Sequence, residues 1–253
     1  MSVDTLAPKL LWIESHSPLP SVENAWGKDT DAPGLLAAGA DLGVDRLLEA
    51  YSKGIFPWYN PKQPVLWWSP DPRMVLQIEN FKLHRSLRKT LSRYAAQPNF
   101  ELSFDRSFDA VIEACAKSPR EGQNGTWIVP EMVQAYKELH RAGYAHSAET
   151  WLDGKLVAGL YFVCIGKAIF GESMFSTLSD GSKMALAALV HVCSQHGIRA
   201  IDCQQNTAHL ASMGAQEMTR SEFLSLSVPA LSQQSPHWES AQIDWDLWRT
   251  ASL

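Results

Sequence analysis

Hydrophobic residues recur along this chain with two different periods, and the change of period predicts its fold class. Residues 81–94 place Leu83, Leu87, Leu91 and Tyr94 on one side of a helix, which indicates a buried face. Pro and Gly mark the ends of several similar segments. We therefore predict further helices at 45–53, 106–117, 130–141, 180–196, 207–213 and 221–226.

The segment 145–176 lacks the helical period and indicates successive strands. Asp153-Gly154 is a strong hairpin turn, and a second reversal falls at 165–167. Another strand is predicted at 198–204, which is rich in apolar and β-branched residues. Helices around such a meander predict an α+β fold with a mainly antiparallel sheet flanked by helices.

The first part of the chain differs from the rest in its composition. Residues 1–72 are rich in Pro and Gly and carry a single helix signal among loops and short strands. The regular pattern begins after the Pro-rich run at 61–72. We predict a small N-terminal α/β domain over 1–72 and a larger domain over 73–253, whose polar tail after residue 231 packs back on the surface.

Composition excludes several classes of protein. The 253 residues are 45% hydrophobic and 19% charged, which is ordinary for a globular protein and unlike a disordered one. Without an apolar run of about 18 residues or a signal peptide, we expect a cytoplasmic protein with no membrane contact. Four separated Cys and eight His lack metal-ligand spacing, and no Gly-rich phosphate loop occurs, so we expect no metal and no cofactor.

Three features could carry chemistry. Asp202 and Gln204 end a predicted strand, where alternation would place both on one face and Ile201 and Cys203 on the other. They could position a reacting amine or simply form a polar strand edge. Glu172 stands among apolar residues and, if buried, needs an amine, a guanidinium or backbone donors; it could equally hold a structural hydrogen bond to a neighbouring loop.

Basic residues and tryptophans indicate a partner that is flat or anionic. Five cations and no acid occur within 81–94, although such stripes are often only solvated. The net charge of −5 argues against general adhesion to nucleic acid, so a basic patch would be local. Ten Trp residues favour flat ligands such as bases or sugar rings.

Eight ordered motifs between residues 30 and 225 resemble the bacterial leucyl/phenylalanyl-tRNA–protein transferases. They read G-L-L-A-A-G-A-D-L (34–42), A-Y-S-K-G-I-F-P-W-Y (50–59), L-W-W-S-P-D-P-R (66–73), G-T-W-I (125–128), A-H-S-A-E-T-W (145–151), G-E-S-M-F-S (171–176), S-K-x-A-L (182–186) and I-D-C-Q (201–204). The resemblance implies an acetyltransferase-like (GNAT) second domain. It also implies transfer of Leu, Phe and less readily Met from aminoacyl-tRNA to proteins with N-terminal Arg or Lys, in the N-degron pathway of protein degradation.

The resemblance also implies roles for individual residues. Asp202 and Gln204 would act on the attacking amine, and Glu172 would hold the α-ammonium of the transferred amino acid. The apolar side-chain pocket would be formed by Leu160, Ile169, Met174, Leu189 and Ile201. The tRNA would contact Trp58 and Trp127 through its terminal adenosine, and Lys82, Arg85, Arg88, Lys89 and Arg93 through its acceptor stem.

Other functions remain open at this point. A sugar-binding or sugar-cleaving protein would explain the Trp content, but it predicts a secretion signal. An ordinary acetyltransferase of the same fold would need a coenzyme A loop of the form Arg/Gln-x-x-Gly-x-Gly, and the corresponding stretch here is S-T-L-S-D-G-S-K (176–183). A non-catalytic tRNA-binding module is a third possibility. We expect the protein to act as a monomer.

Overall fold

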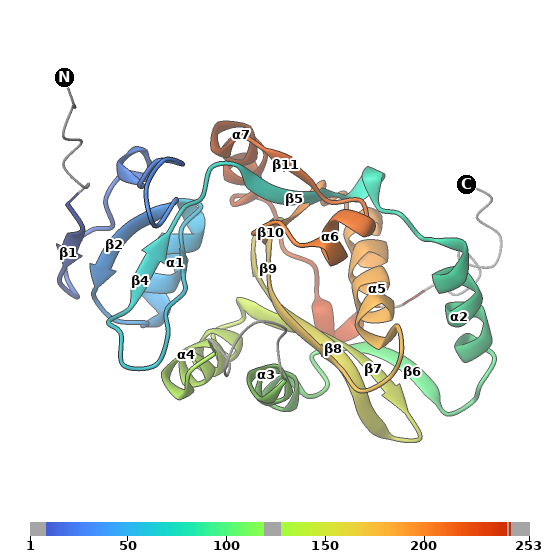
Figure 1. The fold of residues 1–253 in the computed structure, drawn as a ribbon. Helices are drawn as coiled ribbons and strands as arrows, with labels where there is room; N and C mark the ends of the chain where they lie inside the picture. The colour runs from blue at the N-terminus through green and yellow to red at the C-terminus, as the bar shows by residue number, and fades with distance from the viewer. Residues whose placement is uncertain (1–8, 119–127, 242, 244–253) are drawn as a thin grey trace.

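Two β-sheets with helices packed on them form the computed structural model, which describes residues 9–118, 128–241 and 243 (Figure 1). The smaller sheet has four strands in the order β1-β2-β4-β3, and the larger has seven in the order β11-β5-β10-β9-β8-β7-β6. Within the larger sheet only β9 and β10 pair in parallel, and the other neighbours are antiparallel. The predicted α+β class with a mainly antiparallel sheet is confirmed.

The smaller sheet is built from short strands around one helix. Its strands are β1 (Leu11–Ile13), β2 (Leu35–Gly39), β3 (Phe56–Pro57) and β4 (Leu66–Trp68), preceded by the 3-10 turn η1 (Val22–Asn24). Helix α1 (Val44–Ser52) confirms the prediction for 45–53 within one residue. Gly54 ends it with a φ of +71°, a conformation that favours glycine, and lets the chain turn directly into β3.

The larger sheet contains both predicted hairpins. Its strands are β5 (Arg73–Gln77), β6 (Phe100–Phe104), β7 (Ala145–Leu152), β8 (Lys155–Ile165), β9 (Ala168–Ser176), β10 (Ala200–Gln204) and β11 (Gln216–Met218). The turns between β7, β8 and β9 fall at Asp153-Gly154 and Gly166-Lys167, as the sequence predicts. Strands β5, β6 and β11 were not predicted from the hydrophobic pattern.

Helices cover both faces of the larger sheet, as Figure 1 shows. One face packs on α3 (Phe108–Lys117) and α4 (Pro130–Arg141), and the other packs on α5 (Gly181–Gln195). The central residues of strand β8 are apolar because they pack on both faces of the sheet. Tyr161 and Val163 belong to the core cluster shared with α3 and α4, and Leu160 and Phe162 to the cluster around α5. The remaining elements are η2 (Ile78–Asn80), α2 (Arg85–Ala95), α6 (Ala208–Ser212), α7 (Arg220–Ala230) and η3 (Trp238–Ser240).

Helix α2 is shorter than the sequence predicted. The apolar repeat indicated a helix over 81–94, but the helix begins at Arg85, with His84 as its N-cap. The reason is tertiary, since the backbone N–H of Lys82 donates to the carbonyl of Met213 (2.9 Å) and extends the segment ahead of the helix. Lys82 therefore lies outside the helix on which Arg85 and Lys89 stand.

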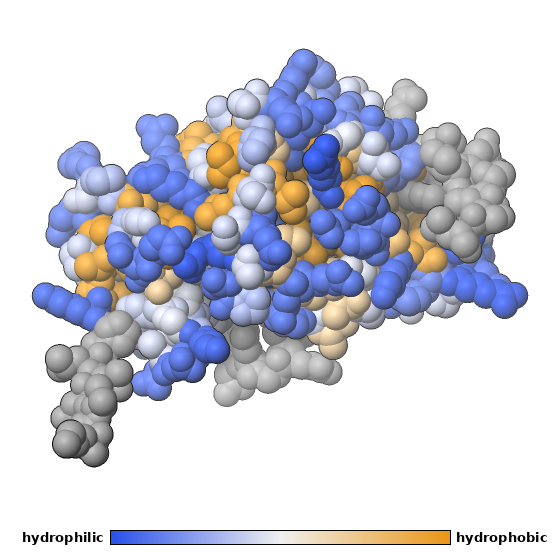
Figure 2. All heavy atoms as spheres, turned by 90° about the horizontal axis from the view of Figure 1, so that it is seen from above, coloured by the Kyte–Doolittle hydropathy of each residue, from blue (hydrophilic) through white to orange (hydrophobic). Residues whose placement is uncertain are grey.

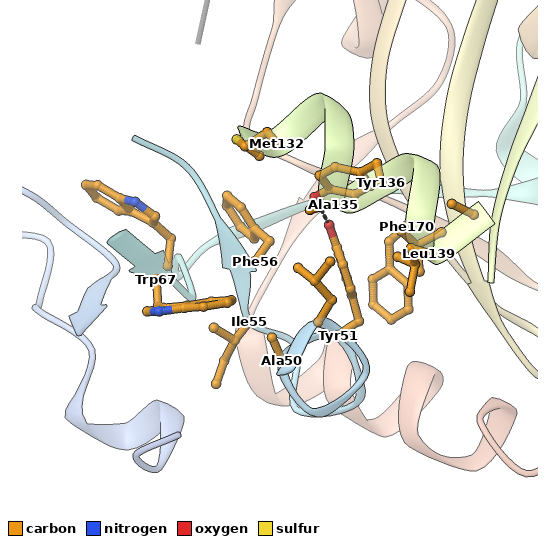
Figure 3. Close-up of a cluster of buried hydrophobic side chains, with 14 of the residues drawn as sticks. Ala50, Tyr51, Ile55, Phe56, Trp67, Met132, Ala135, Tyr136, Leu139 and Phe170 are labelled. Atoms are coloured by element: carbon orange, nitrogen blue, oxygen red, sulfur yellow. Dashed lines mark hydrogen bonds between the residues drawn. The ribbon is translucent and has the colours of Figure 1, made fainter. Parts of the chain in front are cut away.

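The core runs from the small sheet into the large one without interruption. Figure 3 shows Tyr51 and Phe56 of the N-terminal part packed with Tyr136 and Leu139 of α4 and Phe170 of β9. Buried apolar surface of this kind stabilises folds by about 25 cal/mol per Å². The two sheets are thus held together by a shared core, and a domain boundary at residue 72 stays a prediction.

The surface is mostly polar. Seen from above, polar side chains dominate and apolar ones appear in separate areas (Figure 2).

Trp238 anchors the described part of the C-terminal tail, being 2% exposed and packed 4.8 Å from the Phe162 ring. The prediction that the tail packs back is confirmed to that extent. None of the helices in the described ranges has the length and apolar character to cross a membrane.

Candidate active site

A cavity of about 330 Å³ opens where β9 and β10 stop pairing. The two strands pair only at Ile169–Phe170 and Ile201–Asp202, and beyond this point their side chains line the cavity. Helix α5 and strands β8, β9 and β10 contribute its apolar lining, and Phe56 of β3 and Trp58 just after it also line the cavity. The lining residues are Phe56, Trp58, Ser118, Leu160, Tyr161, Gly171, Glu172, Ser173, Met174, Leu186, Leu189, Ile201, Cys203, Gln204, Gln205, Thr207, His209 and Leu210.

Glu172 is aimed into the cavity by a β-bulge. In the pairing of β8 with β9, Tyr161 lies opposite Ser173 and Phe162 opposite Gly171, so Glu172 has no partner residue. A bulge of this type bends the strand and redirects the extra side chain. The bulge therefore turns the polar side chain of Glu172 into the cavity. The apolar neighbours of Glu172 still pack in the cores on the two faces of the sheet.

Three side-chain donors converge on the Glu172 carboxylate. The Tyr51 hydroxyl donates to Oε1 (2.7 Å), the Tyr136 hydroxyl to Oε2 (3.1 Å) and the Gln204 amide to Oε1 (2.8 Å). The two tyrosine hydroxyls also contact each other, as the dashed line in Figure 3 marks. The sequence predicted an amine, a guanidinium or backbone donors as partners of Glu172. In the structure its partners are two tyrosine hydroxyls and a side-chain amide.

The environment of Glu172 favours the neutral form of its carboxyl when no cation lies beside it. Burial raises its pKa to about 8, although hydrogen bonds from Tyr51 and Tyr136 act in the opposite direction. The negative charge of Asp202 raises this pKa further, and the Gln204 amide lowers it. Burial also raises the pKa of Tyr51 and Tyr136 well above 10, so both remain neutral donors. A bound ammonium would favour the carboxylate form of Glu172, because an opposite charge nearby stabilises the ionised group.

Asp202 and Gln204 do not share a face of β10, contrary to the alternation that the sequence predicted. Within the described chain, Gln204 lines the cavity together with Ile201 and Cys203, whereas Asp202 does not. The physical reason is a register shift against β5 between Asp202 and Gln204, with a φ of +62° at Gln204. This irregularity rotates Gln204 onto the face that alternation would have given to its neighbour Cys203.

Asp202 is held by an arginine that sequence reasoning missed. The Arg73 guanidinium donates through Nε to Oδ1 (2.8 Å) and through an Nη to Oδ2 (2.6 Å), and both side chains are fully buried. Asp202 Oδ1 also accepts from the backbone N–H of Gln204 (2.8 Å). Asp202 thus fixes the backbone of Gln204 rather than its side chain. The only hint in the sequence was the Arg that ends the motif at 66–73.

Four of the five predicted apolar pocket residues line the cavity. Ile169 does not: it lies opposite Ile201 where β9 and β10 pair, 2% exposed in the core beside the cavity. The structure adds Leu186, Tyr161 and Cys203 to the lining. The four that line the cavity are Leu160, Met174, Leu189 and Ile201.

The predicted tRNA contacts fall in two places. Trp58 lines the cavity mouth, half-buried, with its ring edge-on to Trp68 at 5.3 Å. Trp127 lies outside the described residues. The basic cluster lies away from the cavity lining; four of its members are exposed and Arg88 is half-buried, the exposed ones being Lys82, Arg85, Lys89 and Arg93.

One group of potential metal ligands was not visible as a sequence pattern. Asp105, His140 and His146 lie together at the end of the larger sheet, away from the cavity lining. His146 Nδ1 is hydrogen-bonded to Asp105 (2.6 Å), whose other oxygen accepts from the backbone of Ser147, and His140 Nδ1 is bonded to the carbonyl of Ala145. These bonds explain the cluster as polar groups satisfied at a sheet end.

The chain is similar to a known protein family. Residues 75–227 match the profile described as leucyl/phenylalanyl-tRNA protein transferase, and residues 40–71 match the profile of its N-terminal domain. A leucyl/phenylalanyl-tRNA–protein transferase of Polaromonas sp. (strain JS666 / ATCC BAA-500) is 57% identical over 92% of each chain. One of Albidiferax ferrireducens is 54% identical over 94% of each chain.

Solved structures show more distant similarity. L-PGS from Bacillus licheniformis has a TM-score of 0.36 at 11% identity, covering 65% of this chain and 51% of its own. A GCN5-related N-acetyltransferase from Kribbella flavida has a TM-score of 0.31 at 12% identity, covering 68% of this chain and 60% of its own. The two profile matches and the identity to relatives across more than nine-tenths of the sequence show that this chain belongs to the leucyl/phenylalanyl-tRNA protein transferase family.

Proposed function

We propose that this protein transfers Leu, Phe and less readily Met from aminoacyl-tRNA to the α-amine of proteins that begin with Arg or Lys, as an enzyme of the N-degron pathway of protein degradation. The observation that carries the proposal is Glu172, whose carboxylate lies in an apolar cavity beside Gln204. This combination suits an amino acid with a charged amine and an apolar side chain. Family membership supports the same conclusion.

The α-ammonium of the transferred amino acid is placed at Glu172. Tyr51, Tyr136 and Gln204 hold the carboxylate in one orientation before the ligand arrives. An ammonium at this position compensates for part of the hydration that the Glu172 carboxylate loses on burial. It therefore lowers the pKa of the carboxyl from about 8. The preference for a free α-amine over an acylated one follows, because an acylated amine carries no charge.

The side chain of the transferred amino acid occupies the apolar part of the cavity. Its walls are Leu160, Met174, Leu189 and Ile201, which select Leu and Phe by burial. The flexible Met174 side chain can accommodate both a branched and a planar group. Discrimination against a smaller apolar amino acid is expected to be modest, about 10- to 200-fold per methylene.

The transfer step needs positioning more than acid–base strength. The acceptor nitrogen attacks the ester carbonyl, the carbon–oxygen bond to the terminal ribose breaks, and the amine loses a proton as the ribose oxygen gains one. Because Nε2 of Gln204 donates to Glu172, its Oε1 is left to accept a hydrogen bond from the attacking amine. An amide is a very poor base, so Gln204 orients the amine and contributes through proximity.

The reaction requires no cofactor, since the aminoacyl ester is already activated. Acetyl transfer from coenzyme A is a poorer match. The segment before α5 carries Asp180 at the helix N-cap, where it pairs with Lys183 (2.8 Å). A carboxylate at this position opposes the binding of a pyrophosphate at the helix N-terminus.

The tRNA is placed along the cavity mouth. We propose that Trp58 stacks on the terminal adenosine, that Trp127 does the same from the segment outside the described residues, and that the basic cluster contacts acceptor-stem phosphates without reading sequence. The basic cluster consists of Lys82, Arg85, Arg88, Lys89 and Arg93. We also propose a domain boundary at residue 72, a monomeric protein and a cytoplasmic location.

Transfer of labelled Leu from charged tRNA to a test protein beginning with Arg tests the function. The same protein beginning with Met is the control, and no ATP, metal or coenzyme A is added. We expect label on the Arg protein alone. Binding of charged tRNA without transfer would instead indicate a tRNA-binding module.

A further inference from the structure

The buried ion pair between Arg73 and Asp202 lies directly behind the cavity. Both side chains have no solvent exposure, and two hydrogen bonds of 2.8 and 2.6 Å join them. A bidentate contact of this kind fixes the plane of the carboxylate as well as its position. Removing either partner would leave an uncompensated buried charge.

The position of Asp202 matters because Gln204 has a backbone conformation that non-glycine residues rarely adopt. Its φ of +62° is strained for a residue with a side chain, so contacts with other residues must stabilise this backbone conformation. One contact that supplies this support is the hydrogen bond from the Gln204 backbone N–H to Asp202 Oδ1 (2.8 Å). This is the oxygen that accepts from Nε of Arg73. The guanidinium, the carboxylate and the Gln204 backbone thus form one chain of contacts.

Arg73 also connects the cavity to the smaller sheet. The third nitrogen of its guanidinium, Nη1, donates to the carbonyl of Gly54 (3.2 Å). The guanidinium carbon lies 4.8 Å from the centre of the Phe56 ring, which lines the cavity. On its other side the guanidinium lies 4.7 Å from the Phe223 ring of α7. These contacts lock one rotamer of Arg73 and tie the cavity wall to strand β10.

We propose that Arg73 is a positioning residue for aminoacyl transfer, which acts through Asp202 to hold Gln204 in the left-handed conformation that turns its amide into the cavity. This inference rests on the proposed function for its kinetic consequence. Arg73 itself does not line the cavity within the described residues, so it is expected to affect kcat more than substrate binding. A displacement of the Gln204 amide by about 1 Å can reduce the rate about 100-fold.

Arg73→Lys and Arg73→Met test the proposal in the full-length protein. Lysine keeps a charge for Asp202 but cannot form the paired hydrogen bonds, so this variant should fold and lose about 10-fold in kcat. Methionine removes both and should lose up to about 100-fold. The KM for aminoacyl-tRNA should change less than kcat in both, because Tyr51 and Tyr136 still donate to Glu172 when the Gln204 amide moves. Gln204→Ala combined with either substitution should be no slower than Gln204→Ala alone, because Arg73 acts through Gln204.

A matched control separates this role from simple stabilisation. Arg46 is another buried arginine, which pairs with Glu49 and bonds the carbonyls of Ser15 and Ser17 at the far side of the smaller sheet. Arg46→Met should lower the melting temperature as Arg73→Met does, yet retain kcat per folded molecule. An Arg73→Lys protein with wild-type kcat, or one whose loss multiplies with that of Gln204→Ala, would overturn the proposal.

The side-chain amide resonances of Gln204 give a readout that does not depend on activity. They are assigned by their loss in Gln204→Ala. We expect Arg73→Lys to move them towards the values of a free amide, whereas Arg46→Met leaves them in place. A wild-type protein that transfers no amino acid would refute the proposed function while these resonances still report on Arg73. Unmoved resonances in Arg73→Lys would refute the positioning role.

Discussion

Tyr51 and Tyr136 lie 85 positions apart in the chain, yet their hydroxyls contact each other and donate to the same carboxylate. One comes from α1 beside the smaller sheet and the other from α4 on the larger sheet. The carboxylate of Glu172 is therefore prepared by both parts of the fold. Neither the cavity nor the ammonium site proposed at Glu172 is complete within one of the two sheets.

The first prediction concerns these tyrosines. Tyr136→Phe removes a hydrogen bond that lowers the pKa of Glu172, so that pKa should rise further above 8. A smaller fraction of Glu172 is then ionised at pH 7, and a rise of about one pKa unit should increase the KM for aminoacyl-tRNA about tenfold at this pH. The increase should be smaller at about pH 9, where Glu172 is largely ionised in the wild type as well. Tyr144→Phe is the matched control, because the side-chain donors to Glu172 within the described residues are Tyr51, Tyr136 and Gln204 and do not include Tyr144. An unchanged KM at both pH values would contradict the role given to Tyr136.

The second prediction separates the ammonium from the rest of the tRNA. Glu172→Gln keeps the size of the side chain but removes its charge. Aminoacyl-tRNA should bind at least tenfold more weakly to this variant, since a hydrogen bond to a charged group contributes about 1.5–3 kcal/mol. Deacylated tRNA should bind as to the wild type. Equal losses for the two tRNAs in a direct binding assay would show that Glu172 does not contact the amino acid.

The third prediction concerns side-chain selectivity. Met174→Ala enlarges the apolar part of the cavity and should shift the ratio of kcat/KM values towards Phe over Leu by about 3- to 10-fold, because the larger ring still fills the space. Ile169→Val is the control, since Ile169 lies in the core beside the cavity and not in its lining. A Leu to Phe ratio that moves equally in both variants would exclude Met174 as a selecting residue.

The fourth prediction tests the basic cluster. Arg85→Glu with Lys89→Glu should raise the KM for aminoacyl-tRNA at low salt and flatten its dependence on salt, because fewer counterions are released on binding. Arg141→Glu with Lys155→Glu makes the same change of charge at exposed positions elsewhere. Because both variants have the same net charge, the general electrostatic repulsion between protein and tRNA should be similar in the two. If they give the same salt dependence, α2 does not contact the tRNA phosphates.

The elements of the fold were largely predictable from sequence, whereas the partners of the site residues were not. Helix α4 begins at Pro130 and ends at Arg141 as predicted, because Pro and Gly mark its ends locally. Arg73 and Asp202 are 129 positions apart, and local periodicity carries no information about such contacts. The bulges at Glu172 and after Asp202 decide which side chains face the cavity, and one extra residue reverses the alternation on which sequence reasoning depends.

The final prediction concerns stability. The pKa of Glu172 is raised from 4.5 in the unfolded chain to about 8 in the fold. Between these values the folded protein binds a proton that the unfolded chain lacks, so stability should fall as pH rises from about 4.5 to 8. Glu172→Gln has no such titration. Its free energy of unfolding relative to wild type should therefore increase from pH 5 to pH 8, by on the order of 1–3 kcal/mol after allowance for partial solvent access.

Urea unfolding of both proteins across this pH range measures the difference, and its midpoint should move in favour of Glu172→Gln as pH rises. Glu149→Gln is a useful comparison, because Glu149 is also buried and accepts hydrogen bonds from Ser103, Ser107, Ser147 and Trp151. That variant should be destabilised at neutral pH, since it loses acceptors for buried donors. A pH-independent difference between wild type and Glu172→Gln would mean that Glu172 is already ionised in the empty cavity, and that the ammonium meets a preformed charge.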